Sequence, residues 1–528
     1  MCDKENQNFE LNNTNMYEVT QEDIKSLINL FAEKSYNAGT ENPEMNAILQ
    51  SCIQFMELDY SVAVVQNDLG ELSYNYPRQL PILEYEKKCY AVDHNLSLEK
   101  TNMSARKASL SPPQTNNIQK RIDVQKTREV FNNAKFSRCR TRFPIPVIMY
   151  KNKYICRSST LSRGFEIYGR SGLELFDSYI LQFLEKSSKD ENQASDGTLT
   201  ESVGELEDIA ETAANNENSG TAPPQFFDQV RNNDIELLKY FNVETIVDLM
   251  VENQKVKYGM YMSSSEKVEK SLYVDFKLIS MPYPGCEFFK DFRDRAYEAE
   301  GLHFNFDHSQ CDASLNIPED PSLAALEIDW DTYKSWDLIT LTQNYIKFIL
   351  QGFENNTSSI LVHCISGWDR TPLFISLLRL SLWADGLIHN SLDEYQILYL
   401  TIAYDWMLFG HQLNNRLNKR EEIFFFCFFM LKYLPKNEFD NSSGRNSVNN
   451  QDPLEASVFD ETSGTSPIAN PTGPSSDYSE SPMEDRDTDG FSMVGPTGSL
   501  EELSSEPEDQ RGKRLRKLRN IFYVCYFN

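Results

Sequence analysis

A cysteine and an arginine stand six positions apart in the stretch ILVHCISGWDRTP, residues 360–372. The spacing alone is a weak signal, because the chain holds ten cysteines and such a pair arises easily by chance. The context is more specific. A short apolar run, expected as a strand, ends at Cys364, Gly367 lies in the loop, and a long apolar helix is expected to begin at Arg370.

A strand, loop and helix in this order can bind an anion. Backbone N–H groups of the loop and the helix start point inward, and the helix dipole and Arg370 favour negative charge there. The same field lowers the pKa of the Cys364 thiol, whose thiolate is the reactive form. The pattern therefore predicts phosphomonoester hydrolysis through a phosphocysteine, without a metal or another cofactor. The residues expected to bind the phosphate group are Ile365, Ser366, Gly367, Trp368 and Thr371.

The reaction also needs an acid that protonates the leaving oxygen. Asp369 lies inside the loop, beside the arginine. Asp329, Asp331 and Asp337 lie before the preceding predicted helix, where many cysteine phosphatases carry their acid. The residue pattern leaves both alternatives open.

The elements around this loop indicate an α/β fold with a central mixed sheet. Apolar segments at 243–252, 274–284 and 358–364 predict buried strands, and 335–353 predicts a helix. Three helical segments are expected after the loop, at 371–385, about 391–408 and about 411–434. Upstream, residues 23–36 predict an amphipathic helix, and 59–67 and 70–87 predict strands around a glycine turn.

Composition divides the chain further. The expected parts are a flexible N-terminus (1–18), a small α+β unit (19–110), a phosphatase domain (130–435) with a disordered acidic insert (186–222), a disordered acidic linker (436–510) and a short basic segment (511–528). The basic segment fits a membrane-surface or partner-binding helix, a localisation signal, or a short helix packed on the core.

Residues 100–163 are strongly basic, in a chain of formal net charge −28. Arg138, Arg140 and Arg142 alternate, so on a strand they would share one face. That face is either a solvated basic surface or a patch for phosphate groups and an anionic membrane.

The totals exclude several classes. With 528 residues the chain can build two or three domains, and its acidity argues against a nucleic-acid partner. No paired cysteine spacing and no apolar stretch of membrane-spanning length occur, which favours a reducing cytoplasmic setting. His303, His308 and Cys311 are weak zinc candidates without a second cysteine pair, so no metal site is expected.

The motif HCISGWDRTP resembles the Cys-x-x-Gly-Trp-Asp-Arg-Thr loop of the myotubularin family of phosphoinositide 3-phosphatases. The stretch YDWMLFGHQLNNR (404–416) is similar to that family's Trp-x-x-Phe-Gly-His motif, and FSRCRTRFPIPVI with CRSS is similar to its Arg-rich first strand. The resemblance runs from about residue 55 to 435, the acidic insert excepted. It is highly specific in the last hundred residues of that range, where the chain looks most like a divergent branch of the family.

The resemblance implies removal of the 3-phosphate from phosphatidylinositol 3-phosphate and phosphatidylinositol 3,5-bisphosphate, on endosomal and autophagic membranes that the protein visits peripherally. It implies Cys364 as nucleophile, Arg370 as phosphate clamp and Asp369 as acid. It also implies that the small N-terminal unit is a degenerate pleckstrin-homology-like domain. A tyrosine or dual-specificity protein phosphatase and a non-catalytic phosphoinositide-binding adaptor are the alternatives. The sequence indicates no protein partner.

Two positions depart from the family pattern. Ser366 stands where many active relatives carry an aspartate, and Gln412 where many carry a basic residue. The basic residue four positions further on is present as Arg416, which is therefore expected to contact the substrate. Loss of one cation weakens the case for the bisphosphate, although Lys419 or Arg420 could compensate.

Overall fold

The computed structural model of the chain describes residues 18–87, 121–163, 224–257, 260–318, 326–434 and 510–527. The predicted acidic insert lies outside these residues, as do the predicted flexible N-terminus and acidic linker except for one terminal residue of each.

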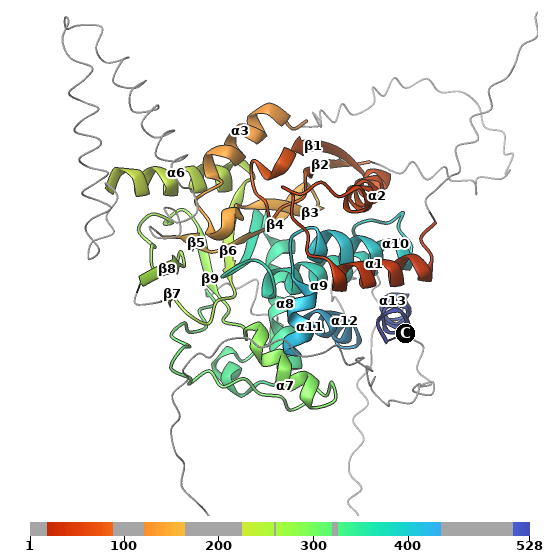
Figure 1. Cartoon of the computed structure of the whole chain (residues 1–528). Helices are drawn as coiled ribbons and strands as arrows, with labels where there is room; N and C mark the ends of the chain where they lie inside the picture. Colours follow the sequence, from red (N-terminus) through yellow and green to blue (C-terminus); the bar gives the residue numbers. More distant parts are fainter. Residues whose placement is uncertain are drawn as a thin grey trace, which may run out of the picture. The chain divides into compact units, whose positions relative to one another are not determined.

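A five-stranded mixed sheet lies at the centre of the described fold (Figure 1). Its order is β3 (Ile145–Tyr150), β4 (Lys153–Ser159), β10 (Ser359–Cys364), β6 (Val243–Asp248) and β9 (Lys277–Ser280). The first two strands pair antiparallel and the other neighbours pair parallel. All six residues of β10 are buried, as expected for a central strand covered on both faces. The predicted mixed sheet is confirmed, and Cys364 ends its middle strand.

Helices pack on this sheet and on one another: α9 contacts β10 and β4, and α6 contacts β6. The helices are α6 (Pro224–Tyr240), α7 (Phe289–Asp294), α8 (Leu338–Asn355), α9 (Arg370–Ala384), α10 (Glu394–Leu400), α11 (Leu413–Lys419) and α12 (Ile423–Phe429). Every residue of α9 is buried, so this helix is enclosed by protein on all sides rather than exposed on one face. The single helix predicted over 411–434 is wrong: Arg420 adopts a left-handed φ of 62° and separates α11 from α12. The segment predicted at 391–408 is α10 continued by a π-helix, Thr401–Met407.

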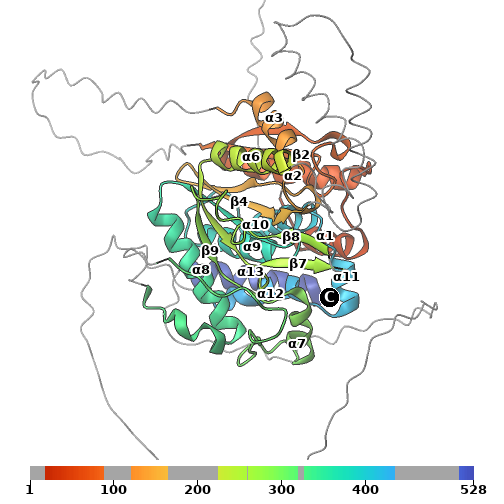
Figure 2. The ribbon, with the colours of Figure 1, turned by 90° about the vertical axis from the view of Figure 1, so that its left-hand side faces the viewer.

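The N-terminal elements pack on the same core. They are α1 (Gln21–Glu33), α2 (Pro43–Asp59), the antiparallel pair β1 (Tyr60–Gln66) and β2 (Gln79–Glu86), and α3 (Val124–Ala134). A capping box between Thr20 and Asp23 begins α1. The Tyr76 hydroxyl donates to the Phe143 carbonyl at 2.6 Å, which ties this region to the segment before β3. Figure 2 shows α3 beside α6, and the two helices are in contact.

Short elements complete the described fold. A three-stranded sheet has the order β5 (Leu161–Ser162), β8 (Met260–Ser264) and β7 (Gln254–Lys257). The short 3-10 helices are Asp68–Gly70, Cys139–Thr141, Cys286–Phe288, Trp330–Ser335 and Met430–Lys432. None of the helices in these parts of the chain combines the length and the apolar character that a membrane span requires.

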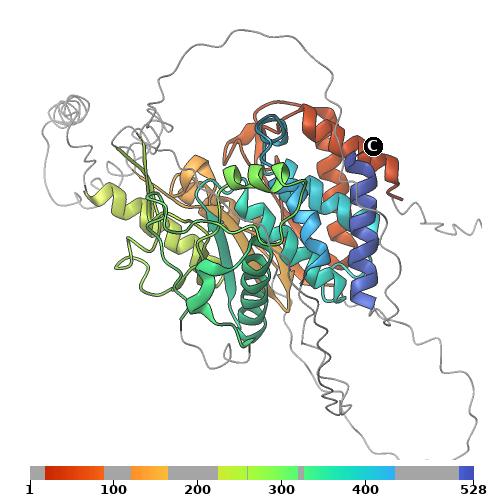
Figure 3. The same ribbon diagram turned by 90° about the horizontal axis from the view of Figure 1, so that it is seen from below.

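The C-terminal basic segment forms a helix, α13 (Gln510–Phe527), which packs against α1, α9 and α10 (Figure 3). Arg511 pairs with Asp385 at 2.6 Å, and the Phe522 ring stacks on Phe428 with centroids 3.8 Å apart. Of the readings that the sequence allowed, the structure therefore shows a helix packed on the core.

The predicted basic face of Arg138, Arg140 and Arg142 is wrong. Residues Cys139–Thr141 form a 3-10 turn in which Arg140 has a φ of 59°, so the three side chains do not alternate along a strand. Arg138 and Arg142 are each only 1% exposed. These two arginines point into the protein and form neither a solvated surface nor a membrane patch.

Candidate active site

The loop from Cys364 to Arg370 joins the end of β10 to the first residue of α9. Gly367 adopts a φ of +68°, and a Cβ added there would lie 2.8 Å from the Ser158 carbonyl oxygen of the neighbouring strand β4. Glycine is therefore required for both the backbone conformation and the close approach.

The Cys364 thiol is buried and surrounded by donors. The Thr371 hydroxyl donates to Sγ at 3.1 Å, and the Gly367 N–H donates to it at 3.3 Å. Burial by itself would raise the pKa of Cys364, but the charge of Arg370 and the hydrogen bonds from Thr371 outweigh it and lower the pKa. The site therefore favours the thiolate.

The carbonyl groups of the loop are turned outward and held by their surroundings. The Ile365 carbonyl accepts from the Thr160 N–H at 3.1 Å, and the Trp368 carbonyl accepts from His411 Nδ1 at 2.8 Å. The Gly367 carbonyl accepts from two guanidinium groups. In a trans peptide the N–H points opposite to the carbonyl, so the N–H groups of Ser366, Trp368 and Asp369 are directed to the inner side of the loop. This arrangement can hold phosphate oxygens above the thiol.

Arg370 is fixed by backbone contacts on one edge of its guanidinium. Its Nη1 donates to the carbonyls of Leu249 and Tyr283, at 3.0 and 3.1 Å. Burial lowers its pKa, but the nearby Cys364 charge more than offsets this, and the pKa is raised. Arg370 thus remains a cation beside the thiolate, as a phosphate clamp requires.

The loop aspartate forms an ion cluster with helix α11. Asp369 accepts from Arg416 Nε and Nη2 at 2.9 and 2.7 Å and lies 3.2 Å from His411 Nδ1. Arg416 also contacts Glu421 at 2.5 Å. Burial raises the pKa of Asp369, but the His411 and Arg416 contacts outweigh it and hold the pKa well below its ordinary value. In the free protein Asp369 is therefore ionised, and Arg416 is engaged by two carboxylates.

The upstream acids have other roles in this structure. Asp337 caps α8 by accepting from the Thr340 N–H at 2.8 Å. Asp329 caps the 3-10 helix Trp330–Ser335, because its side chain accepts from the Asp331 N–H. Asp329 and Asp331 are both exposed. The sequence left Asp369 and the upstream acids open; of these, Asp369 is the one that lies in the loop itself.

Trp368 lies between two arginines. The guanidinium carbon of Arg140 is 3.9 Å from the centre of its ring and that of Arg142 is 4.7 Å from it. The half-buried Trp368 side chain therefore packs on the Arg-rich segment. Sequence patterns did not reveal that the Arg-rich segment contacts the loop, although an arginine amid apolar strand residues was a usable signal.

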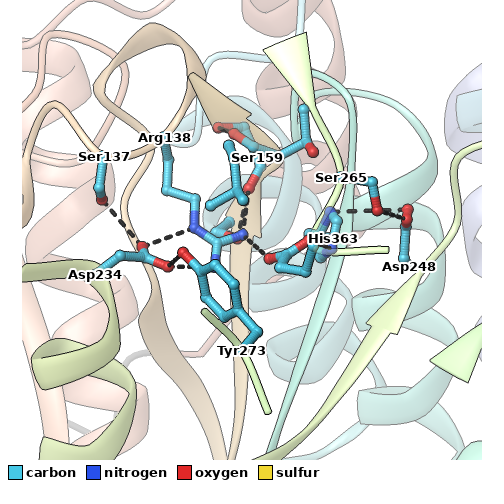
Figure 4. Close-up of polar contacts among 12 residues, drawn as sticks. Ser137, Arg138, Ser159, Asp234, Asp248, Ser265, Tyr273 and His363 are labelled. Atoms are coloured by element: carbon cyan, nitrogen blue, oxygen red, sulfur yellow. Dashed lines mark hydrogen bonds and ion pairs between the residues drawn. The ribbon is translucent and has the colours of Figure 1, made fainter. Parts of the chain in front are cut away.

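A buried charge network surrounds His363, the residue before Cys364 (Figure 4). His363 Nε2 is 3.1 Å from Glu266, whose other oxygen is 2.6 Å from Arg138. Arg138 also pairs with Asp234 at 2.8 Å, and the Tyr273 hydroxyl donates to the same carboxylate at 2.8 Å. On the other side of His363, Lys267 pairs with Asp248 at 2.9 Å. Sequence patterns did not predict this network; the one visible signal was a histidine within an apolar strand.

No group of three or more histidine, cysteine or acidic side chains within the described ranges is arranged to hold a metal ion. His303, His308 and Cys311 all lie in those ranges.

Known proteins with similar sequences are phosphoinositide phosphatases. Residues 334–469 match the model of a myotubularin-like phosphatase domain. Human phosphatidylinositol-3,5-bisphosphate 3-phosphatase MTMR14 is 44% identical over 422 residues, which are 79% of this chain and 58% of that protein. The mouse protein of the same name is 44% identical over 419 residues, 78% of this chain and 58% of its own length. A phosphoinositide 3-phosphatase of Saccharomyces cerevisiae is 32% identical over 103 residues, 19% of this chain and 14% of that protein.

The chain spans about 58% of the length of the two MTMR14 proteins. The matched part includes the loop, the Phe-Gly-His segment and helices α11 and α12. The chain is therefore a homologue of the MTMR14 phosphatases and carries a myotubularin-like phosphatase domain.

Proposed function

We propose that this chain is a phosphoinositide 3-phosphatase with a cysteine-phosphatase fold, which acts through a phosphocysteine. The observation that carries the proposal is the Cys364 thiol, whose pKa is lowered, at the base of a loop that turns its carbonyls outward and ends at Arg370. The substrates named for the similar proteins supply the substrate class.

In the first step the Cys364 thiolate attacks phosphorus. The P–S bond forms as the P–O bond to the inositol ring breaks, and Asp369 gives a proton to the leaving oxygen. In the second step Asp369 takes a proton from water, the water oxygen bonds to phosphorus, and the P–S bond breaks to restore the thiolate. Arg370 and the inward N–H groups stabilise the transferring group in both steps.

The acid role requires a proton on Asp369, which is ionised in the free protein because of His411 and Arg416. A bound phosphate dianion adds negative charge beside Asp369 and so raises its pKa. Substrate binding therefore shifts Asp369 toward the protonated form that the first step consumes.

Phosphatidylinositol 3-phosphate and phosphatidylinositol 3,5-bisphosphate are the proposed substrates, reached by transient contact with anionic membranes that carry them. The test is phosphate release from a panel of phosphoinositides and a phosphotyrosine peptide, by wild type and by Cys364→Ser. We expect release from the 3-phosphate lipids by wild type, and a loss of at least about 1000-fold in the variant. Release from the peptide alone would replace the proposal with a protein phosphatase. Binding to the lipids without release would replace it with an adaptor.

A further inference from the structure

Two buried arginines bind one carbonyl of the phosphate loop. Arg142 Nη1 donates to the Gly367 oxygen at 3.1 Å, and Arg157 Nη2 donates to the same atom at 3.2 Å. Arg142 precedes β3 and Arg157 lies within β4, so both come from segments about 200 residues away from the loop in sequence. Together they fix the peptide whose N–H, on Trp368, faces the inner side of the loop.

Neither arginine has a carboxylate partner within 4 Å among the described residues, although they are only 1% and 2% exposed. The Asp405 carboxylate binds Arg379 at 2.8 Å through both oxygens, and only the Asp405 backbone carbonyl accepts from Arg157. Burial, together with the neighbouring guanidinium groups, lowers the pKa of Arg142 well below its ordinary value, and burial lowers the pKa of Arg157. A guanidinium nonetheless stays protonated in proteins, so two uncompensated charges lie beneath the loop.

The Phe-Gly-His segment that follows α10 supports these two arginines. The Arg157 guanidinium lies 4.2 Å from the centre of the Phe409 ring. Gly410 has a φ of +74°, and a Cβ there would lie 2.9 Å from Arg142 Nη2, so glycine leaves the space that this arginine fills. His411 then binds the next loop carbonyl, on Trp368. Phe409 and Gly410 thus support the two arginines that bind the loop, and His411 binds the loop directly.

A count of charges shows what the two arginines can balance. Arg142, Arg157 and Arg370 bring three positive charges to the loop, while Arg416 is shared by Asp369 and Glu421. The Cys364 thiolate supplies one negative charge, and Cys364 acts electrostatically on both buried arginines. A phosphate dianion supplies the other two. Since Glu421 balances Arg416, the site is neutral when it holds the thiolate, a dianionic phosphoryl group and the protonated Asp369 that the first step uses.

We propose that Arg142 and Arg157 are positioning residues that hold the Gly367 peptide in its binding orientation and make the loop selective for phosphate dianions. This inference rests on the proposed function for its biological meaning, since the same site would hold the 3-phosphate of a lipid. It assigns the Arg-rich segment a role beneath the loop, where the sequence suggested a membrane face.

The test uses the whole chain with Arg142→Met and Arg157→Met, and Arg379→Met as the matched control. Arg379 is equally buried but is paired with Asp405, so its loss leaves an unpaired carboxylate. Three properties are measured: the pH at which Cys364 is half-maximally alkylated by iodoacetamide, read by mass spectrometry of its peptide; the affinity for inorganic phosphate by calorimetry; and the temperature of unfolding. None requires turnover of a lipid, so a failure of the proposed substrate leaves this test readable.

The groups that act on the Cys364 thiol are Arg370, Thr371 and Asp369, besides Arg142 and Arg157. Loss of either of the last two should move the alkylation midpoint to higher pH and weaken phosphate binding about tenfold. The unfolding temperature should stay near the wild-type value, because an uncompensated charge has been removed. The control should unfold at a clearly lower temperature.

The conservative variants Arg142→Lys and Arg157→Lys retain the charge without the forked donor geometry. They should restore the alkylation midpoint toward wild type, while phosphate binding stays weakened because the Gly367 peptide is held less firmly; where a methionine variant does not fold, this weakened binding is the readout. The proposal is overturned if phosphate affinity stays at its wild-type value in every variant that folds, or if the alkylation midpoint is unchanged in a methionine variant that folds. It is equally overturned if the lysine substitutions move the midpoint as far as the methionine substitutions do.

Discussion

Arg138 and Arg142 lie four residues apart, are equally buried, and have opposite electrostatic surroundings. Arg138 binds two carboxylates, Asp234 at 2.8 Å and Glu266 at 2.6 Å, within the buried network around His363 (Figure 4). Arg142 binds a backbone carbonyl of the phosphate loop and no carboxylate among the described residues. One segment of chain thus carries a neutralised arginine and an unneutralised one.

The difference separates the stability of the fold from function. A buried cation with its own carboxylates is satisfied in the free protein, and breaking the pair leaves an uncompensated charge. A buried cation without them is a cost to folding, and such costs are retained where a ligand brings the missing charge. The neutralised arginines should therefore control stability, and the unneutralised ones should control anion binding.

The largest effect should come from breaking the neutralised side. Asp234→Ala removes the carboxylate that accepts from Arg138 Nε and Nη2, and from the Tyr273 hydroxyl. We expect a loss of about 3–5 kcal/mol in the free energy of unfolding, measured by denaturant titration. Asp275→Ala, which removes an exposed pair with Lys239, is the control and should cost less than about 1 kcal/mol. Equal losses in the two variants would contradict the comparison.

The pair Asp369–Arg416 is an exception to the comparison: Arg416 is neutralised by a carboxylate, yet that carboxylate belongs to the phosphate loop. Its loss is therefore expected to affect catalysis. Asp369→Asn should slow release from a lipid by about 100- to 1000-fold and barely affect an aryl phosphate whose leaving group needs no proton. The contrast between substrates is the measurement. Equal slowing of both would mean that Asp369 only holds the loop. If Asp331→Asn gave the contrast instead, the acid would be upstream.

Gly367→Ala should lower both the stability of the fold and the affinity for phosphate, each by a smaller amount. The added Cβ would meet the Ser158 carbonyl at 2.8 Å with φ at +68°, and relief would turn the Gly367 carbonyl away from its two arginines. We expect a loss of about 1–3 kcal/mol in stability together with weaker phosphate binding. Gly352→Ala in α8, where nothing lies within 4 Å of the added atom, should be neutral or slightly stabilising. A stable Gly367 variant with unchanged phosphate affinity would show that the carbonyl's position is unimportant.

Much of this architecture could be predicted from local patterns, because apolar runs and their periodicity report burial directly. The strand ending at Cys364 and the buried helix after Arg370 are confirmed by β10 and α9. The split of the helix over 411–434 could not be foreseen, since it depends on one left-handed residue, Arg420. The burial of Arg142 beneath the phosphate loop could not be predicted either. Its partner is a carbonyl 225 positions away in sequence, and charge composition says nothing about such long-range contacts.

The smallest expected effect concerns the charge of His363. The buried network around it contains three carboxylates and two permanent cations, so it is neutral only if the His363 imidazole is protonated. The carboxylates are Asp234, Asp248 and Glu266, and the cations are Arg138 and Lys267. Burial lowers the pKa of His363, but Glu266 and Asp248 outweigh it and raise the pKa. A raised folded-state pKa stabilises the protein fully below about pH 6.5, and this contribution is lost as pH rises through the folded-state value. The difference in unfolding free energy between wild type and His363→Gln should therefore shrink with rising pH, by at most about 1.4 kcal/mol per unit. If this difference did not change with pH, His363 would be neutral and the network would carry a net negative charge. The statement that the network around Arg138 is neutralised would then be wrong.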